Sequence, residues 1–330
     1  MKSIIFSAPN KVTLCEIPEP LVGKDEVLIR VKVSGICHTD YEILKGNYGN
    51  NAFPLIPGHE FSGVIVKVGE NVTQFKDGDR VVVDPNIGCK NCKACARGWI
   101  NLCENLGAYG VTTNGGFSEF CAVASKRVHS IGNISFKRAA LAEPMGCILN
   151  ALDTVHADWI KNVLIFGAGP MGILMGLALK QLGITEVTYC DKAEDRLALA
   201  ESFGFSSVLS GAKDLFNWRQ QADLAVEATG ASTVAAELTN YIANGGKGLF
   251  FGVCQSELKI NVSPFDIMCR QLMLSGSHSL NRNIPRSLEV ISALGVELDS
   301  IISHEVDLSE ICEFLGGQMP RKSLKVQWSN

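Results

Sequence analysis

Four cysteines at short spacing carry the clearest chemical signal in this sequence. Cys89, Cys92, Cys95 and Cys103 fall within fifteen residues. Thiolates at such spacing supply four soft ligands for a tetrahedral zinc ion, and a set without histidine or an open position predicts a structural site. An iron–sulfur cluster uses the same ligands and stays an alternative, as does an unoccupied or redox-active set of thiols.

A second set of metal-ligating residue types is dispersed along the chain. GICHTD occupies residues 35–40, PGHE residues 57–60 and AEP residues 142–144. Each is weak evidence by itself, because a cysteine at a strand end is usually a small buried hydrophobe. Spacing alone therefore leaves a joint metal site open without establishing it.

A glycine-rich turn, GAGPMG, follows the apolar run VLIF and opens a helical pattern. In such a turn Gly167 allows the tight bend, Gly169 lets a pyrophosphate approach the backbone, and Gly172 lets helix and strand pack closely. The helix start, with Pro170 and Met171, offers unpaired N–H groups to phosphates. This predicts a dinucleotide site, and a glycine turn without a ligand is the alternative.

The acid at the end of the next predicted strand indicates which dinucleotide binds. Asp191 follows residues 186–190 (EVTYC). Its carboxylate can accept a hydrogen bond from a ribose 2′-hydroxyl and repels a 2′-phosphate, which predicts NAD rather than NADP. The positive charges of Lys192 and Arg196 lie near enough in the sequence to weaken the repulsion of a 2′-phosphate.

The elements that position these residues change character along the chain. Before residue ~140, alternating segments and Gly/Pro/Asn turns predict strands, among them residues 26–33, 61–68 and 80–84. From residue 162, apolar runs alternate with helical patterns, which predicts a parallel sheet covered on both faces. The predicted fold class is α/β: a β-rich domain, a doubly wound parallel-sheet domain, and a C-terminal tail that returns to the first.

The amino-acid composition excludes several classes of protein. The chain has 330 residues, 46% of them hydrophobic, and a net charge of −4, which excludes a disordered chain and argues against a nucleic-acid partner. No stretch reaches the roughly 18–20 apolar residues that span a bilayer. The segment before Pro9 is too short for a signal peptide, so we expect a cytoplasmic protein without a membrane partner.

In the order and separation of its motifs, the chain resembles the zinc-containing medium-chain alcohol dehydrogenases, and most of all their polyol or sorbitol dehydrogenase-like branch. GICHTD, PGHE, the four-cysteine lobe, GGFSEF (residues 115–120), AEP and GAGPMG carry the resemblance over essentially the whole length. It implies a GroES-like catalytic domain at residues 1–146 with a structural zinc lobe at 86–106, a Rossmann domain at 147–280, and a C-terminal return at 281–330. It also implies two zinc ions per chain, one catalytic and one structural, and NAD.

The resemblance assigns the dispersed motifs to a catalytic zinc site. Cys37, His59 and Glu143 become ligands, with Glu143 standing where the simple alcohol dehydrogenases have their second cysteine. Glu60 lies close by and is an alternate ligand. Asp40 is expected to orient His59 by accepting its second ring N–H.

Further roles follow from the same resemblance. Thr39 matches the hydroxyl that binds the substrate oxygen and relays its proton, and His38 stands where some relatives contact the pyrophosphate. Glu42 replaces the relay histidine of the animal enzymes, and Ser279 or a neighbour replaces a polyol-enzyme arginine. The remaining expected cofactor contacts are Thr229, Gly252, Val253, Ser275 and Ser277.

The implied reaction is hydride transfer from a secondary alcohol of a polyol to NAD, which gives a ketose or ketone. A simple alcohol, an amino alcohol such as threonine, or a sugar phosphate are alternative substrates for the same mechanism. A non-catalytic redox sensor that binds NAD and zinc is an alternative of another class. The resemblance also implies a homodimer or homotetramer, with the apolar residues 261–274 as a candidate surface. The pocket-lining candidates, chosen by neighbourhood alone, are Tyr41, Tyr48, Phe53 and Tyr109.

Overall fold

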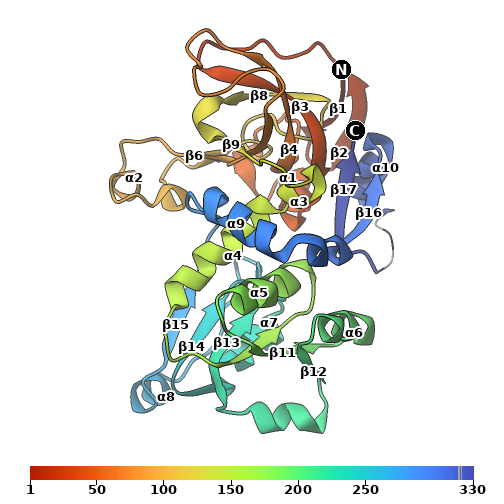
Figure 1. Ribbon diagram of the computed structural model, residues 1–330. Helices are drawn as coiled ribbons and strands as arrows, with labels where there is room; N and C mark the ends of the chain where they lie inside the picture. The colour runs from red at the N-terminus through yellow and green to blue at the C-terminus, as the bar shows by residue number, and fades with distance from the viewer. Residues whose placement is uncertain (319, 321) are drawn as a thin grey trace. The chain divides into compact units, whose positions relative to one another are not determined.

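The structure is a computed structural model that describes residues 1–318, 320 and 322–330. The chain divides into two compact units (Figure 1). Met1–Gly146 and Leu280–Asn330 form the first unit, and Cys147–Ser279 forms the second. The first unit is therefore built from both ends of the chain.

A seven-stranded sheet is the framework of the first unit. Its strand order is β16-β17-β3-β4-β5-β9, with β8 also paired to β3, and only β16 and β17 run parallel. The strands are β3 (Glu26–Gly35), β4 (Glu60–Val68), β5 (Arg80–Val83), β8 (Phe120–Ala124), β9 (Val128–Ser130), β16 (Ile302–Val306) and β17 (Lys325–Ser329). The C-terminal strand β17 lies directly beside β3.

Strand β3 is buried more completely than its sequence predicts. EVLIRVKV alternates as a half-buried strand does, yet residues of both faces are buried. The reason is its central position, since β3 pairs with β4, β8 and β17. Its apolar side chains, such as Ile29, join a core with Ile4, Phe6, Phe61 and Phe117, and burying each such side chain contributes roughly 1.5–3 kcal/mol.

Shorter elements complete the first unit. Two-stranded sheets are formed by β1 with β2 and by β6 with β7. These strands are β1 (Lys2–Ala8), β2 (Lys11–Glu16), β6 (Asn86–Ile87) and β7 (Gly107–Ala108). The helices are α1 (His38–Lys45), α2 (Lys93–Ala96), α3 (Phe136–Ala139), α9 (Ile284–Leu294) and α10 (Leu308–Glu313), with short helical turns η1 (Gly49–Asn51), η2 (Ile100–Leu102), η3 (Ser125–Arg127), η6 (Gly295–Ile301) and η7 (Phe314–Gln318). Helix α4 (Ala142–Val155) begins in the first unit and ends in the second.

The second unit is a six-stranded parallel sheet with the order β12-β11-β10-β13-β14-β15. The strands are β10 (Asn162–Phe166), β11 (Glu186–Asp191), β12 (Ser206–Leu209), β13 (Ala222–Glu227), β14 (Ile242–Phe250) and β15 (Met273–Gly276). The helices are α5 (Pro170–Gln181), α6 (Glu194–Ser202), α7 (Ser232–Glu237) and α8 (Pro264–Cys269), with turns η4 (Lys213–Trp218) and η5 (Leu238–Asn240). The strand order reverses between β10 and β13, and in such sheets ligands bind at the carboxyl ends beside this point.

Strand β14 begins six residues earlier than the sequence indicates. We predict a strand at residues 248–251, whereas β14 starts at Ile242 and runs through the glycine-rich segment NGGKG. The pairing with β13 shifts register between Ala222 and Leu224, and Gly245 takes a left-handed backbone conformation with φ +77°. The irregular pairing accommodates glycines that look like a turn in the sequence.

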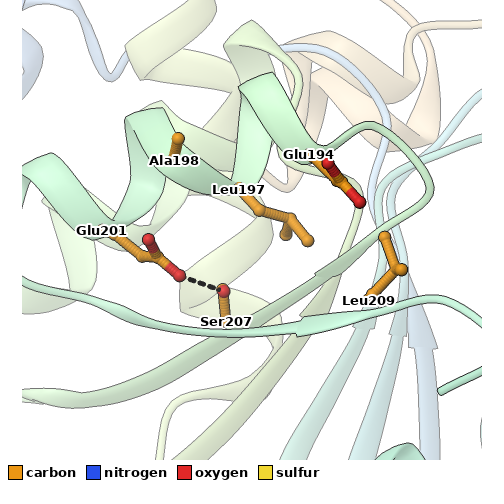
Figure 2. Close-up of a pocket in the computed structure, with 6 residues that line it drawn as sticks. All are labelled: Glu194, Leu197, Ala198, Glu201, Ser207 and Leu209. Carbon is orange, nitrogen blue, oxygen red and sulfur yellow. Dashed lines mark hydrogen bonds between the residues drawn. The ribbon is translucent and has the colours of Figure 1, made fainter.

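A hollow lies between α6 and β12 (Figure 2). It has a volume of about 260 Å³, and Glu201 accepts a 2.6 Å hydrogen bond from Ser207 at its edge. Its lining contains none of the residues that the sequence nominates for catalysis or cofactor binding. In the described part of the chain, no helix is both long and apolar enough to cross a membrane.

Candidate active site and metal centres

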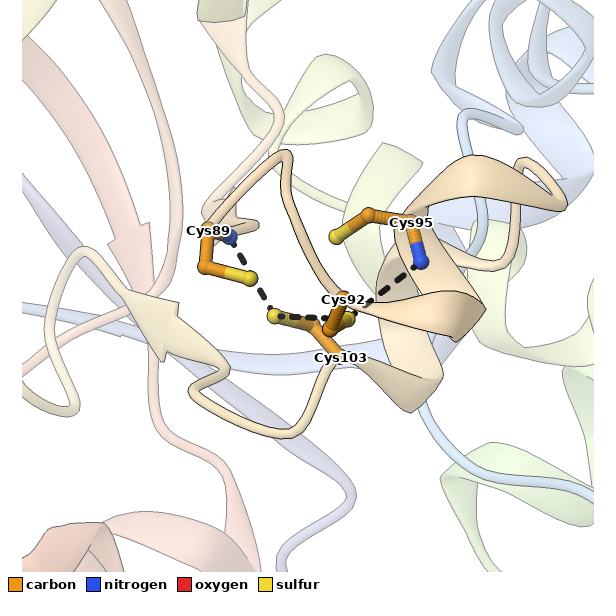
Figure 3. A group of neighbouring side chains, drawn as sticks. All are labelled: Cys89, Cys92, Cys95 and Cys103. Carbon is orange, nitrogen blue, oxygen red and sulfur yellow. Dashed lines mark hydrogen bonds between the residues drawn. The ribbon is translucent and has the colours of Figure 1, made fainter.

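The four clustered cysteines converge on one point in the first unit (Figure 3). Their sulfur atoms all lie within 4.8 Å of one another. The Sγ atoms of Cys92 and Cys103 are 3.9 Å apart. A tetrahedron with Zn–S bonds of about 2.3 Å has edges of ~3.8 Å, so this donor set fits a closed zinc site.

Backbone N–H groups point at these sulfur atoms. Cys92 caps α2 and accepts from Cys95 N at 3.4 Å, and Cys103 Sγ accepts from Cys89 N at 3.2 Å. The N–H groups of Cys95 and Glu104 lower the pKa of Cys92 to about 6. Donors directed at sulfur stabilise the thiolate, which is the form that binds metal.

A second donor group lies at the junction of β3, β4 and α1. Cys37 follows β3 and caps the N-terminus of α1, while His59 directly precedes β4. Because β3 and β4 are antiparallel with Gly35 opposite Glu60, the end of one strand meets the start of the other. The ligand atoms of Cys37, His59 and Glu60 consequently lie within 4.8 Å of one another.

Asp40 faces Nδ1 of the His59 ring, so Nε2 would be the nitrogen left to bind a metal. Its Oδ1 is 3.5 Å from His59 Nδ1, and its Oδ2 accepts a 2.8 Å hydrogen bond from Cys37 N. Burial lowers the pKa of His59, but Asp40 and Cys37 outweigh this and raise it well above its usual value. A buried imidazole between a carboxylate and a thiol is the arrangement that a metal-ligating histidine uses, with Nδ1–H directed at the carboxylate.

The two carboxylates nominated as zinc ligands have different positions. Glu60 belongs to the group whose donor atoms all lie within 4.8 Å of one another, whereas Glu143, buried in the first turn of α4, is not a member of that group. Lys325 on β17 is a member of the site that the sequence does not indicate. Its Nζ lies 2.5 Å from each carboxylate oxygen of Glu60.

The environment of Lys325 is strongly anionic. Burial lowers the pKa of Lys325, but Glu60, Cys37 and Glu143 raise it above its usual value. Glu143 therefore lies near enough to Lys325 to favour its charged form, while Glu60 is the carboxylate grouped with Cys37 and His59. No local signal marks Lys325 in the sequence, because 265 residues separate it from Glu60.

His38 and Thr39 of GICHTD lie on α1. Thr39 Oγ1 is 3.6 Å from Cys37 Sγ. His38 is largely exposed, and its Nε2 lies 3.7 Å from Glu42 in the same helix. The position of Thr39 suits contact with a substrate oxygen, while His38 faces solvent.

In the second unit, the glycine turn joins β10 to α5 as expected of a phosphate-binding loop. Gly167 has φ +106°, Gly169 precedes the helix, and Pro170 is its first residue, with Met171 next. A Cβ on Gly172 would lie 1.9 Å from Gly167 O, so only glycine fits there. The hydroxyl of Tyr189, which the sequence does not nominate, donates to Gly172 O at 3.0 Å and fixes this turn.

Asp191 ends β11 directly beside the glycine turn. Its Oδ2 accepts from Ala168 N at 2.7 Å and its Oδ1 from Ala193 N at 2.9 Å. Arg196 Nη1 lies 3.8 Å from the position of a Cβ on Gly169, while Lys192 is exposed. The carboxylate of Asp191 is thus fixed in orientation, and the guanidinium of Arg196 lies near the glycine turn.

The other nominated cofactor residues lie at or directly after the carboxyl ends of β13, β14 and β15. Buried Glu227 accepts from Thr229 N at 2.7 Å and, through its backbone oxygen, from Gly252 N at 2.8 Å. Ser275 Oγ donates to Thr154 Oγ1 at 3.0 Å. Ser277 Oγ accepts from Asn150 at 3.2 Å, and Val253 is exposed. All of them lie at the carboxyl edge of the sheet, where a doubly wound sheet binds its ligand.

Comparison with known proteins assigns the chain to a family. Residues 23–133 match the alcohol dehydrogenase GroES-like domain, and residues 170–293 match the zinc-binding dehydrogenase domain. The chain is 44% identical over 318 residues to D-altritol 5-dehydrogenase from Agrobacterium fabrum, covering 95% of each. It is 31% identical to D-arabinitol dehydrogenase 1 from Uromyces fabae, covering 99% of this chain and 96% of the other.

Solved structures agree in fold. A zinc-binding dehydrogenase structure from Sinorhizobium meliloti 1021, bound to NADP, superimposes with a TM-score of 0.94 at 28% identity, covering 100% of this chain and 99% of that one. A short chain alcohol dehydrogenase structure from E. coli CFT073, complexed with NADH, gives 0.91 at 26% identity and the same coverage. The predicted fold class, GroES-like plus Rossmann, is confirmed. The chain belongs to the zinc-containing medium-chain alcohol dehydrogenase family, on its polyol dehydrogenase branch, and is an NAD-dependent zinc oxidoreductase.

Proposed function

We propose that this enzyme oxidises a secondary hydroxyl of an acyclic polyol, with D-altritol as the first candidate, and produces the ketose and NADH. The reaction type is inferred from the donor atoms of Cys37, His59 and Glu60, which lie within 4.8 Å of one another. The substrate class is inferred from the similarity to D-altritol 5-dehydrogenase, which is 44% identical over 95% of the chain.

The residues around Cys37 have different roles in the proposed reaction. A zinc ion bound here acts as a Lewis acid toward a hydroxyl oxygen and lowers its pKa. Cys37 and His59 are the protein donors, with Glu143 or Glu60 as the third, and Asp40 orients His59 through its Nδ1. Thr39 Oγ1 accepts the hydroxyl proton of the substrate and passes it toward solvent. Bound NAD⁺ would accept the carbinol hydride, so that one alcohol and one NAD⁺ would give one ketone, one NADH and one proton.

The second unit supplies the NAD site. Gly167, Gly169 and the N-terminus of α5 hold the pyrophosphate. Both oxygens of Asp191 accept backbone hydrogen bonds, yet each carboxylate oxygen has a further lone pair for a ribose hydroxyl. The negative charge of Asp191 disfavours a 2′-phosphate, and Arg196 near Gly169 weakens that exclusion.

We assign the catalytic role to residues 1–146, with a structural zinc lobe at 86–106, the NAD-binding role to residues 147–280, and a supporting role to the returning residues 281–330. In the described part of the chain none of the twelve cysteines takes part in a disulfide. Since disulfides are rare where glutathione keeps thiols reduced, we place the enzyme in the cytoplasm.

We further propose a homodimer through the edge of the parallel sheet. Strand β15 pairs only with β14, so one of its edges is unpaired within the sheet. Phe265, Met268 and Met273 are more than half exposed on α8 and β15. Exposed apolar side chains on the elements at a free strand edge fit pairing with a second copy. Sedimentation of the wild type and of Met273→Asp tests this, and a monomeric wild type contradicts it.

A substrate panel tests the proposed reaction. NADH formation is measured with D-altritol, D-arabinitol, a simple alcohol, L-threonine and a sugar phosphate, with and without a zinc chelator. Chelator-sensitive oxidation of altritol or arabinitol supports the proposal. Turnover confined to the other substrates overturns the polyol assignment, and no turnover with one zinc per chain overturns the enzyme assignment.

A further inference from the structure

We propose that Glu227 is a positioning residue of the cofactor site, whose carboxylate and backbone oxygen hold the two loops that receive the nicotinamide half of NAD. It is the counterpart of Asp191, which holds the glycine turn for the adenylate half. This inference rests on the NAD site proposed above. It assigns a role to a buried acid that lies outside the expected cofactor contacts.

Asp191 and Glu227 occupy equivalent places in the parallel sheet. Each is the last residue of its strand, β11 or β13, and these two strands flank β10. Phe166, the last residue of β10, pairs with Cys190 on one side and with Glu227 on the other. A doubly wound sheet is built from two mononucleotide-binding halves that meet at this point. Glu227 therefore ends the first strand of the half that does not contain Asp191.

One carboxylate oxygen of Glu227 closes the loop after β13. This oxygen, Oε1, accepts from Thr229 N at 2.7 Å, from Thr229 Oγ1 at 2.5 Å and from Gly230 N at 2.8 Å. Thr229 Oγ1 in turn accepts from Ala231 N at 2.9 Å. Because hydrogen bonds to a carboxylate are stronger than those between neutral groups, three donors at one oxygen fix the course of residues 228–230.

The backbone oxygen of Glu227 holds the loop after β14. It accepts from Phe251 N at 2.9 Å and from Gly252 N at 2.8 Å. The two loops are in close contact, since a Cβ on Gly252 would lie 2.3 Å from Gly230 N and a Cβ on Gly230 would lie 2.5 Å from Val253 O. Glu227 thus fixes both loops, and glycine at both positions lets them approach each other.

The loop after β13 also packs against the glycine turn. Ala228 N donates to Phe166 O at 2.9 Å. A Cβ on Gly167 would lie 3.0 Å from Thr229 Cγ2 and 3.1 Å from Ala228 O. The loop that Glu227 closes therefore continues the cofactor site from the pyrophosphate turn toward the second half of the sheet.

The stability of the fold alone does not account for this carboxylate. Glu227 is 0% exposed, and its Oε2 has no hydrogen-bond partner among the residues that the structure describes. A Cβ on Gly252 would lie 2.6 Å from this oxygen. A buried carboxylate oxygen without a partner costs free energy of folding, and departures of this kind are typical of functional sites.

The test compares the affinity of the full-length protein for NADH with that for ADP-ribose, which has the pyrophosphate but no nicotinamide ring. Fluorescence titration gives the first dissociation constant and calorimetry the second. Glu227→Met removes the acceptor of three donors, so we expect NADH to bind on the order of 10-fold more weakly while ADP-ribose binds as it does to the wild type. Glu227→Gln keeps an acceptor oxygen at the same reach and is expected to restore most of the NADH affinity. Glu186→Met, which replaces an exposed acid at the start of β11, is the matched control.

Two results overturn the proposal. One is a folded Glu227→Met protein with the wild-type affinity for NADH. The other is an equal loss of affinity for NADH and ADP-ribose, because Glu227 would then support the second unit as a whole rather than the nicotinamide half of its site.

If Glu227→Met does not fold, Gly230→Ala decides. Its new Cβ would meet Val253 O and separate the two loops without changing Glu227. A selective loss of NADH affinity supports the proposal, and an unchanged affinity or an equal loss for both ligands overturns it. A wild-type protein that binds neither ligand rejects the NAD site itself, and the inference with it.

Discussion

Asp40 Oδ1 lies 3.5 Å from Nδ1 of His59, and within the described residues neither atom has a closer hydrogen-bond partner of its own. Both side chains are buried, and Asp40 is further fixed by the N–H of Cys37. The carboxylate therefore holds the ring so that Nε2 is left for a metal, which makes Asp40 the residue that sets the direction of His59.

Replacing Asp40 by Asn removes the charge behind His59 but keeps an oxygen that can accept from Cys37 N. We expect the affinity of the catalytic site for zinc to fall by about 10–100-fold. Competition with a chromophoric chelator measures this. The exposed Asp214→Asn is the matched control, and an Asp40→Asn protein with wild-type affinity contradicts the assigned role.

Removal of one cysteine from the four-cysteine lobe is expected to lower zinc content from two ions per chain to one. Cys103→Ser leaves three thiolates around a site built for four, so we expect a lower Tm as well, because a structural zinc contributes directly to folding. Elemental analysis and thermal unfolding measure the two effects. Cys15→Ser, a half-buried cysteine outside the lobe, is expected to keep both zinc ions.

The glycine turn does not tolerate a side chain at its third glycine. In Gly172→Ala the new Cβ would lie 1.9 Å from Gly167 O, so the turn must open and NADH binding is expected to be lost. Titration of NADH fluorescence checks this. Gly316→Ala, whose Cβ would have no neighbour closer than 4.0 Å, is the control, and normal binding by both variants rejects the assignment.

Asp191 is expected to set the preference for NAD. Asp191→Asn keeps the side-chain size but removes the charge that repels a 2′-phosphate. A charged hydrogen bond is worth about 1.5–3 kcal/mol, so the ratio of kcat/KM for NAD to that for NADP should fall by about 10–150-fold. Steady-state rates with both cofactors give this ratio. An unchanged ratio would mean that another group, such as Arg196, sets the preference.

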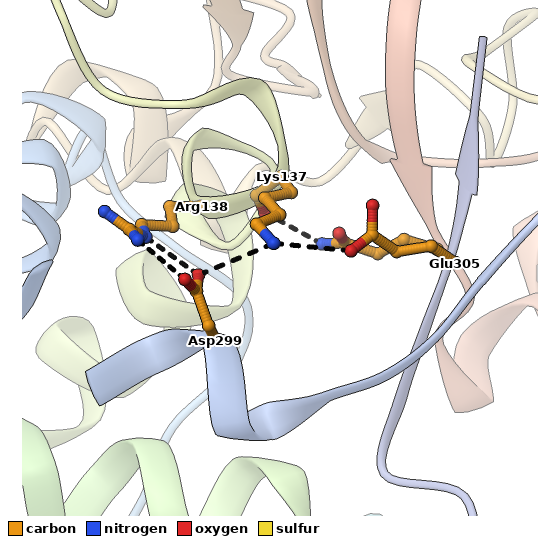
Figure 4. Close-up of polar contacts among 5 residues, drawn as sticks. Lys137, Arg138, Asp299 and Glu305 are labelled. Carbon is orange, nitrogen blue, oxygen red and sulfur yellow. Dashed lines mark hydrogen bonds and ion pairs between the residues drawn. The ribbon is translucent and has the colours of Figure 1, made fainter. Parts of the chain in front are cut away.

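The ion pair of Arg138 with Asp299 (Figure 4) predicts a pH-dependent contribution to stability. The hydrogen bond from Arg138 lowers the pKa of Asp299 below its ordinary value. A carboxyl whose folded pKa is depressed stabilises the fold above the unfolded value, and the contribution disappears as pH falls through the folded value. Because both side chains are partly exposed, Asp299→Asn is expected to cost only roughly 0.5 kcal/mol.

Urea unfolding of the wild type and Asp299→Asn at neutral pH and at acidic pH, below about 3, measures this contribution. The difference between the two proteins should shrink at the lower pH. A difference that grows on acidification contradicts the sign of the pKa change.

Local motifs account for the parts of the site that the sequence predicts well. The four cysteines lie within one short lobe, and GAGPMG lies between a strand and a helix, so nearby residues alone bring each group together. The fold class follows from the same kind of signal, the change from alternating strands to alternating strands and helices.

Long-range pairing accounts for what the sequence could not provide. Lys325 reaches Glu60 only because β17 returns to pair with β3, and no pattern near the C-terminus indicates that partner. The same holds for the choice between Glu60 and Glu143, since their distances to Cys37 depend on how β4 and α4 pack. The early start of β14 is not predictable because NGGKG has the composition of a turn.

The most direct test of the central account compares the wild type with Cys37→Ser for D-altritol-dependent NADH formation, with zinc content measured on the same samples. The account predicts two zinc ions and chelator-sensitive turnover in the wild type. It predicts one zinc ion, a folded protein that still binds NADH, and no turnover in Cys37→Ser. A Cys37→Ser protein that keeps both zinc ions and the wild-type rate would contradict it.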